Sequence, residues 1–182
     1  MGVSVNSKPK PTIIELDNPV VSGVVLCRLS VASAADIAAI EAESNRPPWS
    51  EELFVKEFGN SHSFQFGARL EGRLIGFLIA HVVHDEAHIM NFGVRRDQRG
   101  CGHGRALLEY VLEEMFEQTV RWVTLEVRRG NSVARALYES GGFQEVGVRE
   151  RYYTDNQEDA VVLKLNLQQF ISQLRARLGA KR

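Results

Sequence analysis

The feature that most constrains this fold is a glycine-rich heptapeptide, Arg99-Gly100-Cys101-Gly102-His103-Gly104-Arg105, which joins an apolar run to a helical pattern. The run from Ile89 to Val94 is typical of a buried strand, and the apolar spacing after the glycines is typical of an amphipathic helix. Glycines at such a junction let backbone N–H groups approach an oxyanion without Cβ clashes, and the helix dipole adds partial positive charge there. The junction therefore predicts a site for a phosphate-bearing ligand.

The order of residues in this glycine loop excludes two common phosphate-binding motifs. A nucleotide-triphosphate loop needs Lys after its last glycine, whereas here Arg105 follows Gly104. The dinucleotide fingerprint G-x-G-x-x-G fails as well, because its third glycine would fall on Arg105 or on Leu107. The pattern Arg-x-x-Gly-x-Gly does fit, through Arg99, Gly102 and Gly104. A glycine-rich turn without a ligand is the alternative for the heptapeptide alone.

Composition narrows the class of protein. A chain of 182 residues suits one domain with a sizeable core, and 44% hydrophobic with 25% charged residues is ordinary for a globular protein. The formal net charge of -1 favours neither nucleic acid nor an acidic membrane as a partner. We find no apolar stretch long enough to cross a bilayer and no secretory signal pattern. With two cysteines far apart in sequence, the chain is expected to be reduced and cytoplasmic.

Hydrophobic periodicity and turn residues predict an α/β fold, with a mixed, partly parallel, twisted sheet flanked by helices. Strands are expected at 24–29, 64–70, 74–83, 87–94, 123–127, 143–148 and 160–165. Helices are expected after Ser30 or Ser33, after Ser50, from the glycine loop to about 118, after Asn131 or Ser132, and at 167–178.

The domain organisation follows from the same pattern. Residues 1–21 are polar and dotted with prolines, so we interpret them as a flexible leader. Residues 22–166 are expected to form the single domain, and 167–182 a C-terminal helical extension.

Four segments of the chain share one further similarity. They are Pro48–Phe54, Asn91–Val94 with the glycine loop, Leu125–Phe143, and Arg151–Ala160. Together they resemble the Gcn5-related N-acetyltransferases (GNAT), and within them the RimI-type ribosomal-protein-alanine acetyltransferases. The similarity covers roughly 24–165 and implies a single-domain GNAT fold. The leader, the extra C-terminal helix and the pair Gly141-Gly142 depart from the family pattern.

The resemblance implies that acetyl-CoA binds along the strand and the glycine loop, as a co-substrate and without a metal. The residues that it assigns to acetyl-CoA are Phe92, Gly93, Val94, Arg99, Gly100, Cys101, Gly102, His103, Gly104, Arg105 and Asn131. Backbone groups of 92–94 would hold the pantetheine arm by strand-like pairing. Candidate walls for a substrate peptide are the aromatic residues Trp49, Tyr152 and Tyr153, with ordinary core packing as the alternative.

Two residues are candidates for proton transfer. Strand alternation puts the apolar residues of 123–127 on one face and Glu126 on the other, which by itself describes a solvated carboxylate. Tyr138 lies seven residues after Asn131 and so on the same side of a short helix, where a half-buried core aromatic is the plain interpretation. The resemblance implies instead that Glu126 is the general base, acting through water, and that Tyr138 is the general acid for the leaving thiolate.

The acceptor amine is the less constrained part of the prediction. A free α-amine titrates at about 7.7–8.0 and a lysine at about 10.4, so making the lysine neutral costs on the order of 3 kcal/mol more. This favours a peptide N-terminus. The resemblance implies the N-terminal alanine of a small-subunit ribosomal protein, acetylated by direct attack in a ternary complex. A lysine, another N-terminus or a small-molecule amine remains an alternative acceptor, and a non-catalytic acyl-CoA-binding module is the alternative function.

The expected partner is therefore the N-terminal peptide of a ribosomal protein, bound by a monomer or weak dimer without direct contact to nucleic acid or membrane. Three histidines, His81, His84 and His88, straddle a predicted turn. They lack a supporting cysteine or carboxylate pattern, so a metal site is not favoured.

Overall fold

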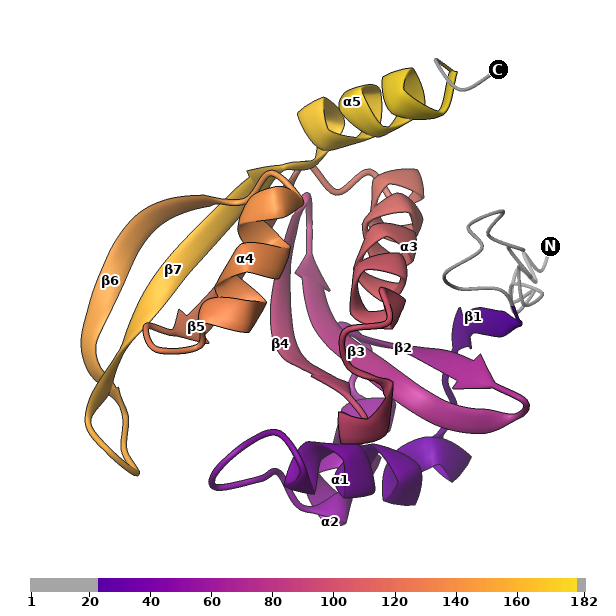
Figure 1. Cartoon of the computed structure of the whole chain (residues 1–182), viewed down its shortest axis with the longest axis vertical. Coiled ribbons are helices and arrows are strands. Elements are labelled where there is room, and N and C mark those ends of the chain that lie inside the picture. Colours follow the sequence, from indigo (N-terminus) through magenta and orange to yellow (C-terminus); the bar gives the residue numbers. More distant parts are fainter. Residues whose placement is uncertain (1–22, 180–182) are drawn as a thin grey trace, which may run out of the picture.

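The computed structural model describes residues 23–179 and forms one seven-stranded sheet with helices on both of its faces (Figure 1). The leader expected at 1–21 lies outside the described residues. The strands are β1 (Val24–Arg28), β2 (Ser63–Leu70), β3 (Arg73–Val83), β4 (Glu86–Val94), β5 (Trp122–Arg128), β6 (Gln144–Tyr153) and β7 (Glu158–Asn166). Their order in the sheet is β1-β2-β3-β4-β5-β7-β6, and within the described residues the β4–β5 pair is parallel while its neighbours pair antiparallel. The expected mixed α/β fold is confirmed.

The helices cover the sheet in two layers. They are η1 (Val31–Ser33), α1 (Ala34–Ala42), α2 (Glu51–Gly59), η2 (Arg96–Gln98), α3 (His103–Glu117), α4 (Ser132–Ser140) and α5 (Leu167–Gly179). Strand β3 separates two cores: Leu74 and Phe77 pack with α1 and α2, whereas Ile75 and Leu78 pack with α3. Burial on both faces explains why β3 reads as a nearly continuous apolar run.

Capping side chains start two of the helices where the sequence indicates. Ser50 Oγ accepts from the Leu53 N–H over 3.4 Å at the start of α2. Asn131 Oδ1 accepts from the Ala134 N–H over 3.1 Å at the start of α4. The expected cap of the first helix by Ser33 is wrong, because its hydroxyl accepts instead from the Arg69 guanidinium over 3.0 Å. Ser30 makes no side-chain cap either, and the 3-10 turn η1 leads into α1.

Helix α5 packs its apolar face on the rest of the fold. Leu167, Phe170 and Ile171 are buried in the core that also contains α3. Within residues 23–179, no helix combines the length and the apolar character needed to span a membrane.

The sheet opens between its two central strands. Strands β4 and β5 pair from Glu86 with Trp122 to Ile89 with Leu125, and each then continues without the other, β4 as far as Val94. Strand β5 stays paired to β7 instead. Figure 1 shows β4 and the β5–β7–β6 half of the sheet diverging toward the end where α1 lies. This divergence positions the candidate site.

Candidate active site

A groove runs along the strand-to-helix junction that the glycine loop predicts. Gly102 occupies the N-cap of α3 with φ of 82°, and Gly100 has φ of 76°, a backbone region that favours glycine. The first N–H groups of α3 have no acceptor within the helix, so they are free to bind an anion. The groove has a volume of about 510 Å³. Nine of the residues assigned to acetyl-CoA line it: Phe92, Gly93, Val94, Arg99, Gly100, Gly102, Gly104, Arg105 and Asn131.

Two charged residues line this groove, and both are arginines, Arg99 and Arg105. We call it the coenzyme groove, after the ligand that the family resemblance implies. Arg99 donates through Nε to the Val94 carbonyl over 2.9 Å and through Nη2 to Ser44 Oγ over 2.8 Å. It therefore ties the glycine loop to the end of α1 while its charge stays at the groove. Arg105 donates to Ser140 Oγ over 2.6 Å. Two cations beside a helix N-terminus match the charge of a diphosphate.

Two assigned residues do not bring their side chains to the groove. Cys101 is exposed, and its Sγ lies 3.6 Å from the Arg99 carbonyl. His103 is 7% exposed, its Nδ1 has no hydrogen-bond partner, and burial lowers its pKa below the usual value. Their assignment to acetyl-CoA rests on backbone groups alone and stays a prediction.

A second cavity of about 470 Å³ adjoins the groove, and Phe92, Asn131 and Tyr138 line both. We call it the acceptor cavity. The three aromatic residues expected as substrate walls all line it: Trp49, Tyr152 and Tyr153. Trp49 also stacks on the core residue Phe54, with ring centres 5.6 Å apart, so it serves packing as well. Unlike the groove, this cavity has acidic residues in its lining: Glu41, Glu126 and Asp155.

Glu126 projects from β5 on the face opposite the apolar residues, as strand alternation predicts. Its side chain is 9% exposed and lies between His88 and Arg149, with Oε2 2.8 Å from His88 Nε2 and Oε1 2.9 Å from Arg149 Nη2. The hydrogen bond from His88 is the largest cause that holds the pKa of Glu126 below its usual value, and the charges of His88 and Arg149 add to it. Glu126 is therefore a carboxylate at neutral pH.

Tyr138 lies on α4 and is 6% exposed, between the rings of Phe92 and Phe143 at 6.4 and 5.6 Å. It lines both cavities. Burial raises the pKa of the Tyr138 phenol well above its usual range. The phenol therefore keeps its proton at every physiological pH and is available as a donor.

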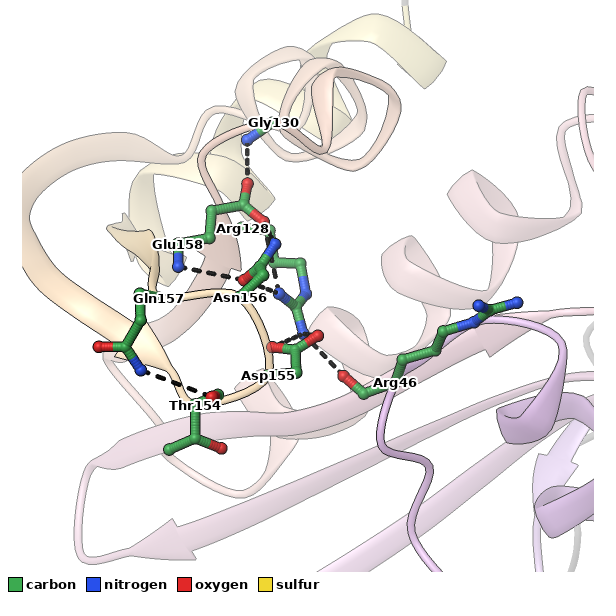
Figure 2. Close-up of polar contacts among 8 residues, drawn as sticks. All are labelled: Arg46, Arg128, Gly130, Thr154, Asp155, Asn156, Gln157 and Glu158. Carbon is green, nitrogen blue, oxygen red and sulfur yellow. Dashed lines mark hydrogen bonds and ion pairs between the residues drawn. The ribbon is translucent and has the colours of Figure 1, made fainter.

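Arg128 holds the outer wall of the acceptor cavity together (Figure 2). Its Nη2 donates to the Arg46 carbonyl over 2.9 Å and to both oxygens of Asp155 over 3.0 Å. Its Nη1 donates to Glu158 Oε2 over 3.3 Å, and its guanidinium stacks 3.9 Å from the centre of the Tyr153 ring. One side chain thus joins the loop after α1 to the hairpin between β6 and β7.

Sequence reasoning missed several residues of the site. Arg128 lies in a segment that carries the family resemblance but was given no role, Arg149 belongs to no motif, and His88 was considered only as a metal ligand. Glu41 is 1% exposed and accepts from Asn45 Nδ2 over 2.8 Å. For His88 the available signal was a polar residue in a mostly apolar strand, and placing it beside Glu126 requires the pairing of β4 with β5.

Comparison with known proteins agrees with this geometry. Residues 34–143 match the model of the acetyltransferase (GNAT) family. A ribosomal protein bS18-alanine N-acetyltransferase of Escherichia coli (strain K12) is 41% identical over 128 residues, which are 69% of this chain and 86% of that protein. The N-alpha-acetyltransferase RimI of Mycobacterium tuberculosis (strain ATCC 25618 / H37Rv) is 34% identical over 147 residues, which are 78% and 91% of the two chains.

Solved structures give the same result. The crystal structure of the ribosomal-protein-S18-alanine N-acetyltransferase from Escherichia coli matches with a TM-score of 0.74 and 36% identity, over 79% of this chain and 94% of that one. The chain therefore belongs to the GNAT acetyltransferase family and is an N-acetyltransferase of the RimI type.

Proposed function

We propose that this chain transfers the acetyl group of acetyl-CoA to a protein N-terminus, and that its substrate is the N-terminal alanine of a small-subunit ribosomal protein. The observation that carries the proposal is the meeting of two cavities at Tyr138, with Glu126 in the lining of the acceptor cavity. The names of the similar enzymes support the alanine acceptor. Action as a monomer or weak dimer in the cytoplasm remains part of the proposal.

The coenzyme groove fits acetyl-CoA by charge and by backbone. Arg99 and Arg105 would face the diphosphate beside the N-terminus of α3. Past Ile89, strand β4 has lost β5 as a neighbour, so its backbone is free to pair with the amides of a pantetheine arm. The divergence of the two strands then directs the thioester toward Tyr138.

The proposed chemistry is direct transfer. The Glu126 carboxylate removes one proton from the α-ammonium group, directly or through water, and the neutral amine attacks the thioester carbonyl carbon. The C–S bond breaks, and the Tyr138 phenol gives its proton to the departing sulfur. The second amine proton, which is lost as the amide forms, restores the phenol. The products are an N-acetylated peptide, coenzyme A as a thiol, and one proton released. The acceptor cavity places Glu126 in a lining that also contains Arg46 and Arg128, so the carboxylate assigned to the proton transfer is part of a mixed-charge wall.

The test uses three matched peptides and the purified enzyme. The first peptide begins with alanine and contains one internal lysine, the second has a blocked N-terminus, and the third lacks the lysine. Fragment mass spectra locate the acetyl group, and a thiol reagent measures coenzyme A release. We expect acetylation at the α-amine of the first and third peptides and none of the second.

Other outcomes contradict parts of the proposal. Acetylation of the blocked peptide at its lysine would point to a lysine acetyltransferase. Thiol release with a small amine but with no peptide would point to a small-molecule acceptor. Binding of acetyl-CoA without thiol release for any acceptor would mean a non-catalytic module.

A further inference from the structure

His88 contacts Glu126, and each of its two ring nitrogens has a polar partner. His88 Nε2 is 2.8 Å from Glu126 Oε2, and His88 Nδ1 is 2.9 Å from Thr124 Oγ1. The parallel pairing of β4 with β5 causes this contact, because it sets His88 directly beside Thr124. The residue that touches Glu126 most closely is therefore itself able to hold a proton.

Thr124 lets His88 change its protonation state without leaving a polar group unpaired. The Thr124 hydroxyl lies within reach of two acceptors, His88 Nδ1 at 2.9 Å and the Ala87 carbonyl at 3.4 Å. When Nδ1 is bare, the hydroxyl donates to it. When Nδ1 carries a proton, that proton is donated to the hydroxyl oxygen, and the hydroxyl donates to Ala87. Both states of the imidazole keep their hydrogen bonds.

The proposed reaction needs such a group. A free α-amine titrates at about 7.7–8.0 and an unperturbed glutamate at about 4.3, a gap of more than three pH units against proton transfer. Imidazole is the side chain whose reference pKa lies between those of a carboxyl group and an α-amine. The side chain of His88 is 34% exposed, compared with 9% for Glu126, so the imidazole has the better access to water.

We propose, on the basis of the proposed function, that His88 is a proton relay and positioning residue for Glu126. The Glu126 carboxylate takes the proton from the substrate ammonium and passes it to Nε2 of His88, in the tautomer that carries its own proton on Nδ1 and donates it to Thr124. The contact of 2.8 Å between Nε2 and Glu126, with Nε2–H as the donor, is the state that follows this transfer. The resulting imidazolium releases one proton to solvent. Glu126 is then again a carboxylate, and the proton count of the transfer is balanced.

Charged and titratable groups surround His88 on this face of the sheet. From β3, His81 pairs across the strands with His88 and is itself bound to Glu57 of α2 at 2.7 Å. From β6, Arg149 holds the other oxygen of Glu126. On the same strand, Glu86 lies two residues before His88. His81 thus has the same residue type, the same kind of carboxylate partner and the same sheet face as His88, but it has no contact with Glu126.

The experiment compares His88→Gln with His81→Gln in the full chain, using the peptide that the wild type acetylates best. Glutamine keeps an N–H donor near Nε2 but cannot titrate. For His88→Gln we expect kcat to fall about tenfold or more, with KM for both substrates within about twofold. The acid limb of the kcat profile should move to lower pH, because the imidazole no longer titrates. For His81→Gln we expect neither change.

Chemical rescue separates a relay from a merely structural role. In His88→Ala, added imidazole at tens of millimolar should raise kcat several-fold, with no effect on wild type or on His81→Gln. An unchanged kcat and pH profile in His88→Gln would overturn the proposal. So would a loss of kcat with an unmoved acid limb and no rescue by imidazole. Peptide acetylation by the wild type tests the proposed function separately, whatever the His88 variants do.

Discussion

The guanidinium of Arg128 stacks on the ring of Tyr153, with 3.9 Å between its central carbon and the ring centre. Both residues line the acceptor cavity, one from β5 and one from the end of β6. The same guanidinium reaches the Arg46 carbonyl in the loop after α1. The shape of the acceptor cavity thus depends on a planar cation that bonds in several directions at once.

Arg128→Lys is therefore expected to weaken peptide binding more than coenzyme binding. A lysine ammonium cannot span Arg46 and Asp155 together, so one of the two loops is released. We expect KM for the peptide to rise about tenfold, KM for acetyl-CoA to stay within about twofold, and stability to fall by about 2 kcal/mol. Steady-state kinetics and urea unfolding measure these quantities.

Arg129→Lys is the matched control, since its ion pair with Asp159 at 3.2 Å is more exposed. We expect a stability change within about 0.5 kcal/mol and an unchanged peptide KM. Equal peptide KM values for the two variants would contradict the role given to Arg128.

Much of the site was predictable because its determinants are local. The strand alternation around Glu126, the Asn131 cap of α4 and the glycine loop before α3 each depend on residues within one element or its boundary. The same locality explains why Tyr138 and Asn131 were correctly placed on one side of a helix, since both line the acceptor cavity.

The parts that could not be predicted depend on contacts between distant segments. His88 meets Glu126 only through the parallel register of β4 and β5. Strand β6 runs to Tyr153, which pairs with Glu158 of β7, whereas the expected end was at 148. It is an edge strand that is exposed on both faces. Without a buried face, the charged residues 149–151 show no apolar alternation for sequence reasoning to detect.

Gly102→Ala, compared with a second glycine of the same φ, separates an effect on acetyl-CoA binding from the general cost of backbone strain. Gly102 has φ of 82°, where an alanine costs on the order of 1–2 kcal/mol. Gly72 has the same φ of 82° in the turn between β2 and β3, outside the groove. We expect both alanine variants to lose similar stability, but only Gly102→Ala to weaken acetyl-CoA binding, by about tenfold or more. Calorimetric titration measures the affinity for acetyl-CoA, and thermal unfolding measures the stability. Equal affinities of the two variants for acetyl-CoA would refute the assignment of Gly102 to the acetyl-CoA site.

The pH dependence of stability should show that Glu126 is held as a carboxylate. Its pKa in the folded state is lowered from 4.5, first by the hydrogen bond from His88, so its contribution to stability is complete above about pH 4.5 and is lost as pH falls through the folded pKa. The stability advantage of the wild type over Glu126→Gln should therefore shrink between pH 5 and pH 3, a range of about two units around the usual titration.

Glu113 gives a control of opposite sign. Burial, followed by the charge of Glu109, raises the pKa of Glu113 above 4.5. Its ionised form therefore destabilises the fold above that pKa, and the wild type should gain stability relative to Glu113→Gln as pH falls. Chemical unfolding at a series of pH values gives both slopes. If the two slopes have the same sign, the electrostatic account of Glu126 fails.

Tyr138→Phe removes the hydroxyl group of Tyr138 and keeps its aromatic ring. The ring packs between Phe92 and Phe143, and phenylalanine keeps that packing, so the melting temperature should stay within a few degrees of wild type. If the phenol donates to the leaving sulfur, kcat should fall by on the order of a hundredfold while the affinity for acetyl-CoA changes little. Because burial raises the pKa of Tyr138 well above its usual range, the phenol stays protonated and should add no basic limb to the wild-type kcat profile below pH 10, about the ordinary tyrosine value.

A better leaving group removes the need for an acid, so an acetyl thioester of a more acidic thiol should restore part of the lost kcat in Tyr138→Phe and leave the wild type nearly unchanged. Equal responses of the two enzymes to that thioester would mean that another group protonates the sulfur.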